Sequence, residues 1–210
     1  IKGHICYSQD KSTLKVYENS YLVCVNGKSK GIFENLPSEY KDLPLKDYGD
    51  KLIIPGMVDL HIHAPQYAFR GMCMDLELMD WLNQYTFPEE EKYTNLDYAK
   101  KAYSIFTKAL KNSATTRACI FATRHRDATV LLMELMEETG LVSYVGKVNM
   151  DREASKALIE ESAESSAYNT FGWINSVNNK FQNTKPILTP RFIPCCTDEL
   201  MEELKQIQMT

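Results

Sequence analysis

The sequence predicts an α/β fold, with a small β module over residues 1–54 followed by four strand–helix units over residues 55–210. Three features indicate this fold: an alternating strand pattern that ends in a tight turn, an apolar run that follows it, and a regular succession of helix and strand patterns after that run. Such alternation is typical of a parallel sheet or barrel that is covered by helices.

A hairpin pattern predicts the N-terminal module. The strand pattern consists of Tyr21, Val23 and Val25 alternating with Leu22, Cys24 and Asn26. Asn26-Gly27 is a favoured two-residue turn between antiparallel strands. The apolar run over residues 52–60 is then typical of a strand buried on both faces, which implies cover by helices.

Helical spacing followed by a strand predicts the first two units. In the first, the apolar positions are Tyr98, Ala102, Ile105, Phe106, Ala109 and Leu110. They precede a strand over residues 117–122. The second helix runs from about Asp127 to Thr139, and Gly140 is placed to end it in the left-handed conformation before a strand over 143–148.

The last two units are predicted in the same way. The third helix carries Ala163, Ala167, Phe171, Ile174 and Val177 at helical spacing. It precedes a strand over residues 187–189. The fourth helix begins near Thr197, with Asp198 and Glu199 in the first turn, where the helix dipole favours negative charge.

Four units are at most half of a (β/α)₈ barrel. The residues leave three interpretations open: an incomplete piece of a longer chain, a subunit that closes by pairing with another half, or an α/β domain that closes differently. In the first two interpretations, the unpaired edge strands of the sheet need a partner.

Composition excludes several classes of function. With 24 basic and 28 acidic residues in 210, the net charge of −4 argues against a nucleic-acid binder. No apolar run is long enough to span a membrane, and no secretory signal pattern opens the chain. The six cysteines lack C-x-x-C spacing, so we expect reduced thiols and a cytoplasmic location.

His61 and His63 are the sharpest candidates for chemistry. Residues two apart on a strand share a face, so both imidazoles can bind one metal ion. The alternative is a pair of core-facing or hydrogen-bonded histidines. Two imidazoles suit zinc and iron equally and do not complete a catalytic site, so the remaining ligands must come from elsewhere.

Other polar residues carry weaker signals. His125 follows a predicted strand at the rim where barrel enzymes place their chemistry, so it either lines the pocket or lies in a solvated loop. His4 is expected at the surface, Cys195 and Cys196 are expected to be packed thiols, and the run Glu89–Glu91 is expected to be a solvated helix start. The sequence lacks the glycine-rich motifs that bind nucleoside triphosphates or dinucleotides. It also lacks the G-x-S-x-G motif of serine hydrolases.

Several segments carry a resemblance to a known family. Residues 55–63 resemble the first-strand signature of the amidohydrolase superfamily, which comprises metal-dependent hydrolases on a (β/α)₈ barrel with a flanking β-sandwich. Within it, the chain resembles the guanine deaminase family over residues 63–67, 81–82, 85–89, 121–125, 146–151 and 189–192. The resemblance implies the first half of a TIM-type amidohydrolase barrel, preceded by a small β-sandwich segment.

The resemblance also implies roles for particular residues. His61 and His63 would be two ligands of a single zinc ion, while Gln66, Arg191 and Phe192 would line a guanine pocket. Trp81 would be a pocket wall or a core residue. Arg191 as a salt-bridge partner and Phe192 as a core residue remain the alternatives.

The implied reaction is hydrolysis of guanine to xanthine and ammonia in purine catabolism, with guanine and water as reactants in a homodimer. The family's proton shuttle and remaining ligands would lie beyond Thr210, so this chain holds no catalytic acid or base and is expected to be inactive alone. Ser113 stands where the family usually has glycine and is expected to strain a left-handed helix cap. Two other functions stay open: an amidohydrolase of another amino-heterocycle, and a noncatalytic half-barrel that assembles with a partner.

Overall fold

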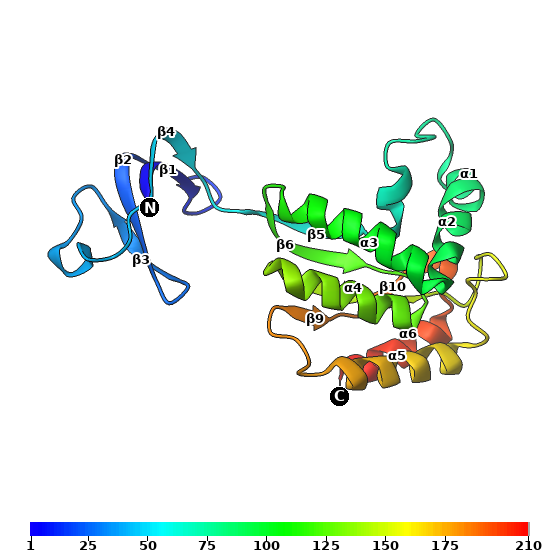
Figure 1. Cartoon of the computed structure of the whole chain (residues 1–210). Helices are drawn as coiled ribbons and strands as arrows, with labels where there is room; N and C mark the ends of the chain where they lie inside the picture. The colour runs from blue at the N-terminus through cyan, green and yellow to red at the C-terminus, as the bar shows by residue number, and fades with distance from the viewer. Residues whose placement is uncertain (210) are drawn as a thin grey trace. The chain divides into compact units, whose positions relative to one another are not determined.

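The computed structural model describes residues 1–209, which form two compact units (Figure 1). The first unit comprises Ile1–Gly56, and the second begins at Met57. None of the helices in the described range is long and apolar enough to cross a membrane.

The first unit is a four-stranded sheet. Its strands are β1 (Lys2–Ser8), β2 (Leu14–Val25), β3 (Lys28–Phe33) and β4 (Asp47–Ile53), in the order β3-β2-β1-β4. β4 runs parallel to β1, whereas the other neighbours are antiparallel. Asn26 and Gly27 have φ angles of 52° and 73°, as a two-residue type I′ hairpin requires, so the predicted turn is confirmed.

A parallel sheet organises the second unit. β5 (Met57–His63), β6 (Thr115–Phe121), β7 (Val142–Gly146) and β9 (Thr184–Pro186) are neighbours in chain order, all parallel. Beyond β7 and β9, the short strands β8 (Val148–Asn149) and β10 (Thr189–Pro190) also pair in parallel. Successive parallel neighbours are the arrangement of consecutive barrel strands, and β5 and β9 form the two edges of this sheet.

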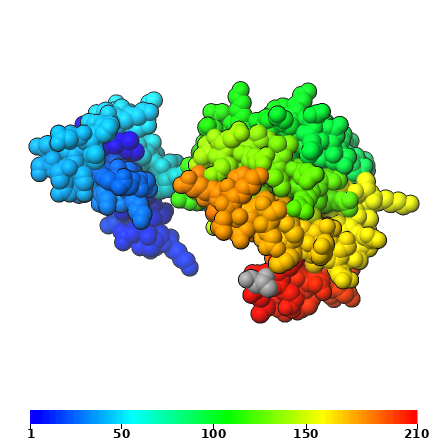
Figure 2. All heavy atoms as spheres, turned by 60° about the horizontal axis from the view of Figure 1, so that its bottom comes forward, coloured from blue at the N-terminus to red at the C-terminus, as the bar shows by residue number. Residues whose placement is uncertain are grey.

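Four helices accompany the strands. They are α3 (Leu96–Lys111), α4 (Arg126–Thr139), α5 (Ala163–Val177) and α6 (Asp198–Gln208). α5 and α6 lie side by side (Figures 1 and 2). The side chains of Asn95, Ser162 and Thr197 accept hydrogen bonds from the first turns of α3, α5 and α6. Gly140 ends α4 at φ 75°, which confirms the predicted left-handed cap.

Short helical turns connect β5 to α3, and some of them line one side of a pocket. In order they are η2 (Pro65–Phe69), α1 (Leu78–Trp81), the π-helical turn η3 (Leu82–Thr86), α2 (Phe87–Glu91) and η4 (Lys92–Thr94). The turns η1 (Ser38–Tyr40) and η5 (Ile193–Cys195) lie elsewhere in the chain.

The main core lies between the parallel sheet and the helices α3, α4 and α5. Its fully buried members include Ile120, Val145, Phe106, Leu132, Met133, Met136 and Trp173. Cys195 and Cys196 are buried, as predicted for packed thiols. Burial of this apolar surface is the main force that holds the helices on the sheet.

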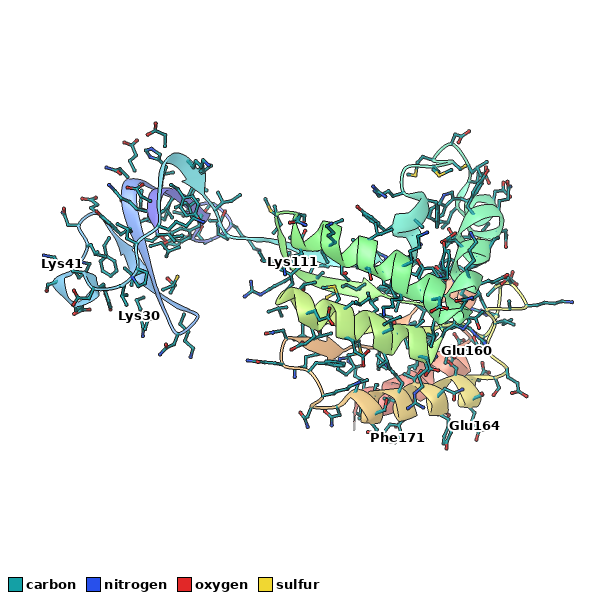
Figure 3. The ribbon with its side chains drawn as sticks, viewed as in Figure 1. Lys30, Lys41, Lys111, Glu160, Glu164 and Phe171 are labelled. Carbon is teal, nitrogen blue, oxygen red and sulfur yellow. The ribbon has the colours of Figure 1, made fainter. Side chains whose placement is uncertain are left out.

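Two predicted core residues lie outside the buried faces. Ile105 on α3 is 54% exposed, and Phe171 on α5 is 45% exposed and lies on the outer side of its helix (Figure 3). On α3 the buried residues are Ala99, Tyr103, Phe106, Thr107 and Leu110. This row is displaced by one residue from the predicted one, and both rows have helical spacing, so spacing alone did not separate them.

The fourth strand differs from its prediction over residues 187–189. The ladder between β7 and β9 ends at Pro186, which has no N–H to continue it, and pairing resumes with β8 at Thr189. Ile187 and Leu188 therefore lie between two short strands. Ile187 still donates one hydrogen bond to the carbonyl of Val145, at 3.1 Å.

Ser113 also departs from its prediction, because it does not adopt a left-handed conformation. Its hydroxyl donates to the carbonyl of Leu110 at 2.7 Å and accepts from the N–H of Thr115 at 3.0 Å. The side chain thus satisfies the end of α3, and the expected strain is absent at this residue.

Candidate functional site

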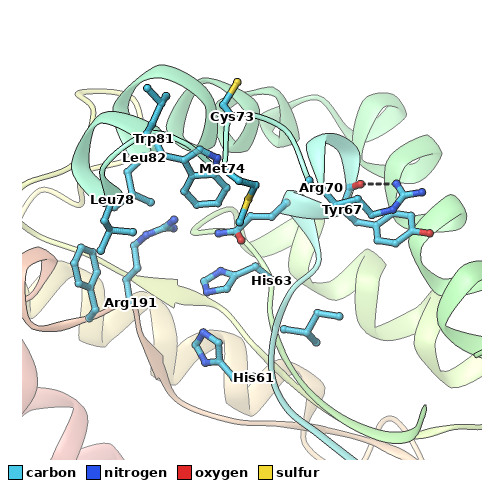
Figure 4. A pocket seen from close by; sticks show the side chains of 15 residues that line it. His61, His63, Tyr67, Arg70, Cys73, Met74, Leu78, Trp81, Leu82 and Arg191 are labelled. Atoms are coloured by element: carbon cyan, nitrogen blue, oxygen red, sulfur yellow. Dashed lines mark hydrogen bonds between the residues drawn. The ribbon is translucent and has the colours of Figure 1, made fainter. Parts of the chain in front are cut away.

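A pocket of about 960 Å³ opens in the second unit, at the carboxyl ends of β5 and β10 (Figure 4). It is lined by His61, Ile62, His63, Gln66, Tyr67, Arg70, Gly71, Cys73, Met74, Leu76, Leu78, Trp81, Leu82, Arg191 and Phe192. Six of the seven side chains singled out in the sequence line this one pocket: His61, His63, Gln66, Trp81, Arg191 and Phe192. The carboxyl ends of parallel strands are where α/β proteins place their ligands.

The two histidines end β5 on the same face of the strand. Their ring centroids are 5.0 Å apart. Phe121, at the end of the neighbouring strand β6, lies with its ring centroid 4.6 Å from that of His61 and 4.7 Å from that of His63. The imidazoles therefore share one aromatic neighbour that supports both.

His63 is held in its neutral form. Burial lowers the pKa of His63 to about 3, and the positive charge of Arg191 and the imidazole of His61 act in the same direction. Its Nδ1 atom is buried and has no hydrogen-bond partner among residues 1–209. A neutral imidazole with an unpaired nitrogen is the form that binds a metal ion.

This donor set fits part of a metal site. His61 and His63 supply two imidazoles, and the described residues contain no group of three or more His, Cys, Asp or Glu side chains that could hold an ion. Catalytic zinc usually takes three protein ligands. The pair therefore matches two ligands of a larger set.

Arg191 follows β10 directly and is held from several sides. Its N–H donates to the carbonyl of Asn149 at 3.1 Å, and its Cζ lies 5.1 Å from the ring centroid of Phe87. Its Nη1 donates to Oε2 of Glu90 at 2.7 Å. Arg191 thus lines the pocket and forms a salt bridge, and its role toward guanine stays a prediction.

The run Glu89–Glu91 is not a solvated helix start, which corrects the prediction. Glu90 is completely buried and Glu89 nearly so. Glu89 accepts hydrogen bonds from Lys92 and from the hydroxyl of Tyr98, and Glu91 accepts one from Ser155. Glu89 and Glu90 are buried on α2, where Glu90 meets Arg191.

Sequence reasoning therefore missed Glu90. One signal was present: Phe87 and Glu90 are three residues apart on α2 and so share a helix face. That face carries an aromatic ring and a carboxylate toward the same guanidinium.

The remaining walls come from the turns after β5 and from the chain after β10. Gln66 lies in η2 and is half-buried. The indole N–H of Trp81 donates to the carbonyl of Met72 at 3.3 Å. Trp81 and Phe192 both line the pocket and also pack against a small core of Leu82, Phe87, Val148, Met150, Leu158 and Cys195. Each therefore combines the pocket position with the core position that the sequence left open.

Tyr67 and Arg70 form a wall that the sequence did not indicate. The Arg70 guanidinium lies over the Tyr67 ring, with Cζ 3.9 Å from the ring centroid, and its Nη1 donates to the Tyr67 carbonyl at 2.9 Å (Figure 4). Stacking of this kind fixes a long cation at the rim of the pocket.

His125 does not line this pocket. It occupies the N-cap position of α4 and lies instead in a second, polar cavity of about 580 Å³ with Arg124, Lys147 and Glu160. Three residues separate His125 from Phe121 at the end of β6. This separation places the His125 side chain away from the histidine pair. Burial lowers the pKa of His125, and the charges of Arg124 and Lys147 add to the shift.

Comparison with known proteins finds a matching family and similar proteins within it. A sequence model described as the amidohydrolase family matches residues 52–209. A guanine deaminase from Rattus norvegicus is 41% identical over 176 residues, covering 83% of this chain and 38% of that protein. One from Dictyostelium discoideum is 34% identical, covering 97% of this chain and 49% of that protein.

A solved structure is also similar. The crystal structure of guanine deaminase from C. acetobutylicum with bound guanine in the active site is 42% identical, with a TM-score of 0.94. The match covers 99% of this chain and 49% of the other. The chain thus spans less than half the length of each of these three proteins.

Proposed function

The chain belongs to the amidohydrolase family, and on that basis we propose that the complete protein hydrolyses guanine to xanthine and ammonia. The observation that carries this proposal is that two imidazoles meet Arg191 and Gln66 in one pocket. The likeness to guanine deaminases at 34–42% identity supports the choice of substrate.

The chemistry of the pocket suits guanine. An arginine fork matches the O6 and N7 acceptors of guanine, and such a pairing is worth about 1–3 kcal/mol of base discrimination. Adenine presents a donor at the same edge and would oppose the guanidinium. Gln66 can donate and accept at once, and Phe192 offers an apolar face to a flat ring.

We propose zinc as the metal, held in part by His61 and His63. Zinc, when bound, would supply a Lewis acid that lowers the pKa of a bound water toward about 7. The protein keeps His63 neutral through burial, and Phe121 fixes the orientation of both rings. Iron suits imidazole ligands equally, so metal analysis of the purified protein decides between the two.

The proton-transferring groups and the other ligands are expected outside residues 1–209. We therefore expect the 210-residue chain alone to release no ammonia from guanine, because two imidazoles do not complete a catalytic site.

Ammonia release by the full-length protein tests the proposal. Guanine is expected to be preferred over adenine, cytosine, pterins and triazines. Preference for another amino-heterocycle would replace guanine as the substrate within the same family. No release from any of them by metal-loaded protein would favour a noncatalytic role.

We propose two further properties, a cellular location and an oligomeric state. All six cysteines are free thiols, which supports a reducing, cytoplasmic location. A homodimer stays a prediction, which light scattering of the full-length protein checks.

A further inference from the structure

We propose that Glu90 is a positioning and specificity-determining residue: it fixes the guanidinium of Arg191 and compensates its charge, so that the pocket favours a neutral purine over an anionic one. This inference rests on the proposed function and adds to it a residue outside the pocket lining.

The contact itself is short and enclosed. Nη1 of Arg191 lies 2.7 Å from Oε2 of Glu90, and the two side chains are 3% and 0% exposed. The partners are 101 residues apart in the chain, so the pair joins α2 to the chain after β10. The Phe87 ring beside the guanidinium and the backbone bond from Arg191 to Asn149 restrict its position further.

The pairing leaves donors for a ligand. Only Nη1 is engaged, and within residues 1–209 neither Nε nor Nη2 donates to another residue. The Nε–Nη2 edge is a two-donor fork, which matches two neighbouring acceptors on a purine. Glu90 thus holds one side of the guanidinium and leaves the other side to the pocket.

The pairing also compensates the positive charge of Arg191. Arginine keeps its proton in proteins, so a guanidinium this deeply buried needs a carboxylate partner. Burial raises the pKa of Glu90, whereas the charge of Arg191 and its hydrogen bond oppose that shift. The two side chains therefore form an ion pair with no net charge of its own.

A compensated guanidinium treats substrate and product differently from an uncompensated one. Guanine is neutral near neutral pH, whereas xanthine is more acidic and readily becomes an anion. If Glu90 loses its charge, Arg191 is left uncompensated and attracts the anionic product. The carboxylate therefore limits product inhibition while it positions the guanidinium.

The test is Glu90→Gln in the full-length protein, with guanine kinetics and xanthine inhibition measured where xanthine is the monoanion. We expect KM for guanine to rise about tenfold and the xanthine inhibition constant to fall about tenfold, with kcat changed by less than about threefold. A purely structural role would not tighten xanthine binding. Unchanged KM and unchanged xanthine inhibition in Glu90→Gln would overturn the inference.

Glu160→Gln is the matched control. Glu160 is also a buried carboxylate in an ion pair, 2.6 Å from Lys147, and it lies outside the pocket lining. The control removes the same charge and the same kind of contact. Xanthine inhibition that tightens equally in both variants would overturn the inference, because the effect would then not be specific to Arg191.

Glu90→Asp provides a second measurement if Glu90→Gln does not fold. Aspartate keeps the charge but shortens the reach, so KM for guanine is expected to rise while xanthine inhibition stays as in the wild type. Tighter xanthine inhibition in Glu90→Asp would contradict the charge argument. Wild-type protein that neither binds nor hydrolyses guanine would instead refute the proposed function, which separates the two failures.

Discussion

Gly146 and Thr189 approach so closely that no side chain fits between them: a Cβ added to Gly146 would lie 2.2 Å from Cγ2 of Thr189 and 2.7 Å from the carbonyl oxygen of Ile187. Thr189 also donates a hydrogen bond to the carbonyl of Lys147 at 2.9 Å. This approach lets β10 pair with β8, and Arg191 follows β10 directly. The position of the pocket arginine therefore depends on the absence of a methyl group on β7.

Gly146→Ala is expected to destabilise the protein by about 1–3 kcal/mol, because the added carbon must displace Thr189 and the backbone of Ile187. KM for guanine is expected to rise as Arg191 moves. Urea unfolding and steady-state kinetics of the full-length protein measure both effects. In the control Gly172→Ala, nothing lies within 4 Å of the added Cβ in α5, so stability should stay level or rise by up to about 1 kcal/mol. Equal losses in the two variants would refute the steric argument.

Arg191→Ala is expected to lower kcat/KM for guanine by about 10- to 100-fold, because a two-donor contact to the purine is lost. It also leaves the carboxylate of Glu90 buried without a partner, which typically costs about 3–5 kcal/mol of stability. The double variant Glu90→Leu with Arg191→Met removes both charges and should regain stability without regaining guanine turnover. Normal guanine turnover by Arg191→Ala would exclude Arg191 from the pocket chemistry.

Removal of the metal by a chelator is expected to abolish ammonia release by the full-length protein, and zinc should restore it. His61→Ala and His63→Ala should each reduce the metal content measured by elemental analysis, since each removes one imidazole from the proposed site. His4→Ala is the control, because His4 lies in the first unit on β1. Full metal content in both His61→Ala and His63→Ala would rule out the pair as ligands.

Acid is expected to weaken the contact between Glu137, near the end of α4, and the chain that leads into β9. Its carboxylate accepts hydrogen bonds from the backbone N–H groups of Gln182, Asn183 and Thr184, at 2.9, 3.0 and 2.9 Å. Burial opposes the shift, but these bonds outweigh it and lower the pKa of Glu137. The stabilisation is therefore complete above the ordinary carboxyl pKa and is lost as the pH falls through the lowered value.

Amide hydrogen exchange at residues 182–184 checks this prediction. Glu137→Gln should speed exchange at neutral pH, and the difference from the wild type should shrink in acid. The neighbouring exposed Glu138→Gln is the control. A difference between Glu137→Gln and the wild type that does not change with pH would show that the charge of Glu137 is not the cause.

Local chemistry made much of the fold predictable. Asn26-Gly27, Gly140 and Thr197 mark a hairpin, a helix end and a helix start through their own backbone preferences, and the structure has each of them in that role. The spacing of His61 and His63 likewise placed two imidazoles on one strand face without knowledge of the rest of the chain.

Contacts between distant segments were not predictable in this way. Glu90 is buried because Arg191 meets it from 101 residues away, and nothing in the run Glu89–Glu91 distinguishes it from a surface cluster. The resumption of pairing at Thr189, beside β8, accompanies a close approach of Thr189 to Gly146, which lies 43 residues earlier in the chain. Ile105 lies outside the buried face of α3, although its spacing in the sequence is also helical, so spacing alone does not decide exposure.

Phe121 restricts the side chains of the two histidines before any ion binds. Because its ring lies against both imidazoles, few rotamers remain open to either side chain once β5 and β6 have paired. The conformational entropy that flexible ligands lose on binding an ion has then already been lost during folding. At the proposed metal site, an ion would meet two donors that are already oriented, so differences in affinity among metals should come from the other ligands rather than from this pair.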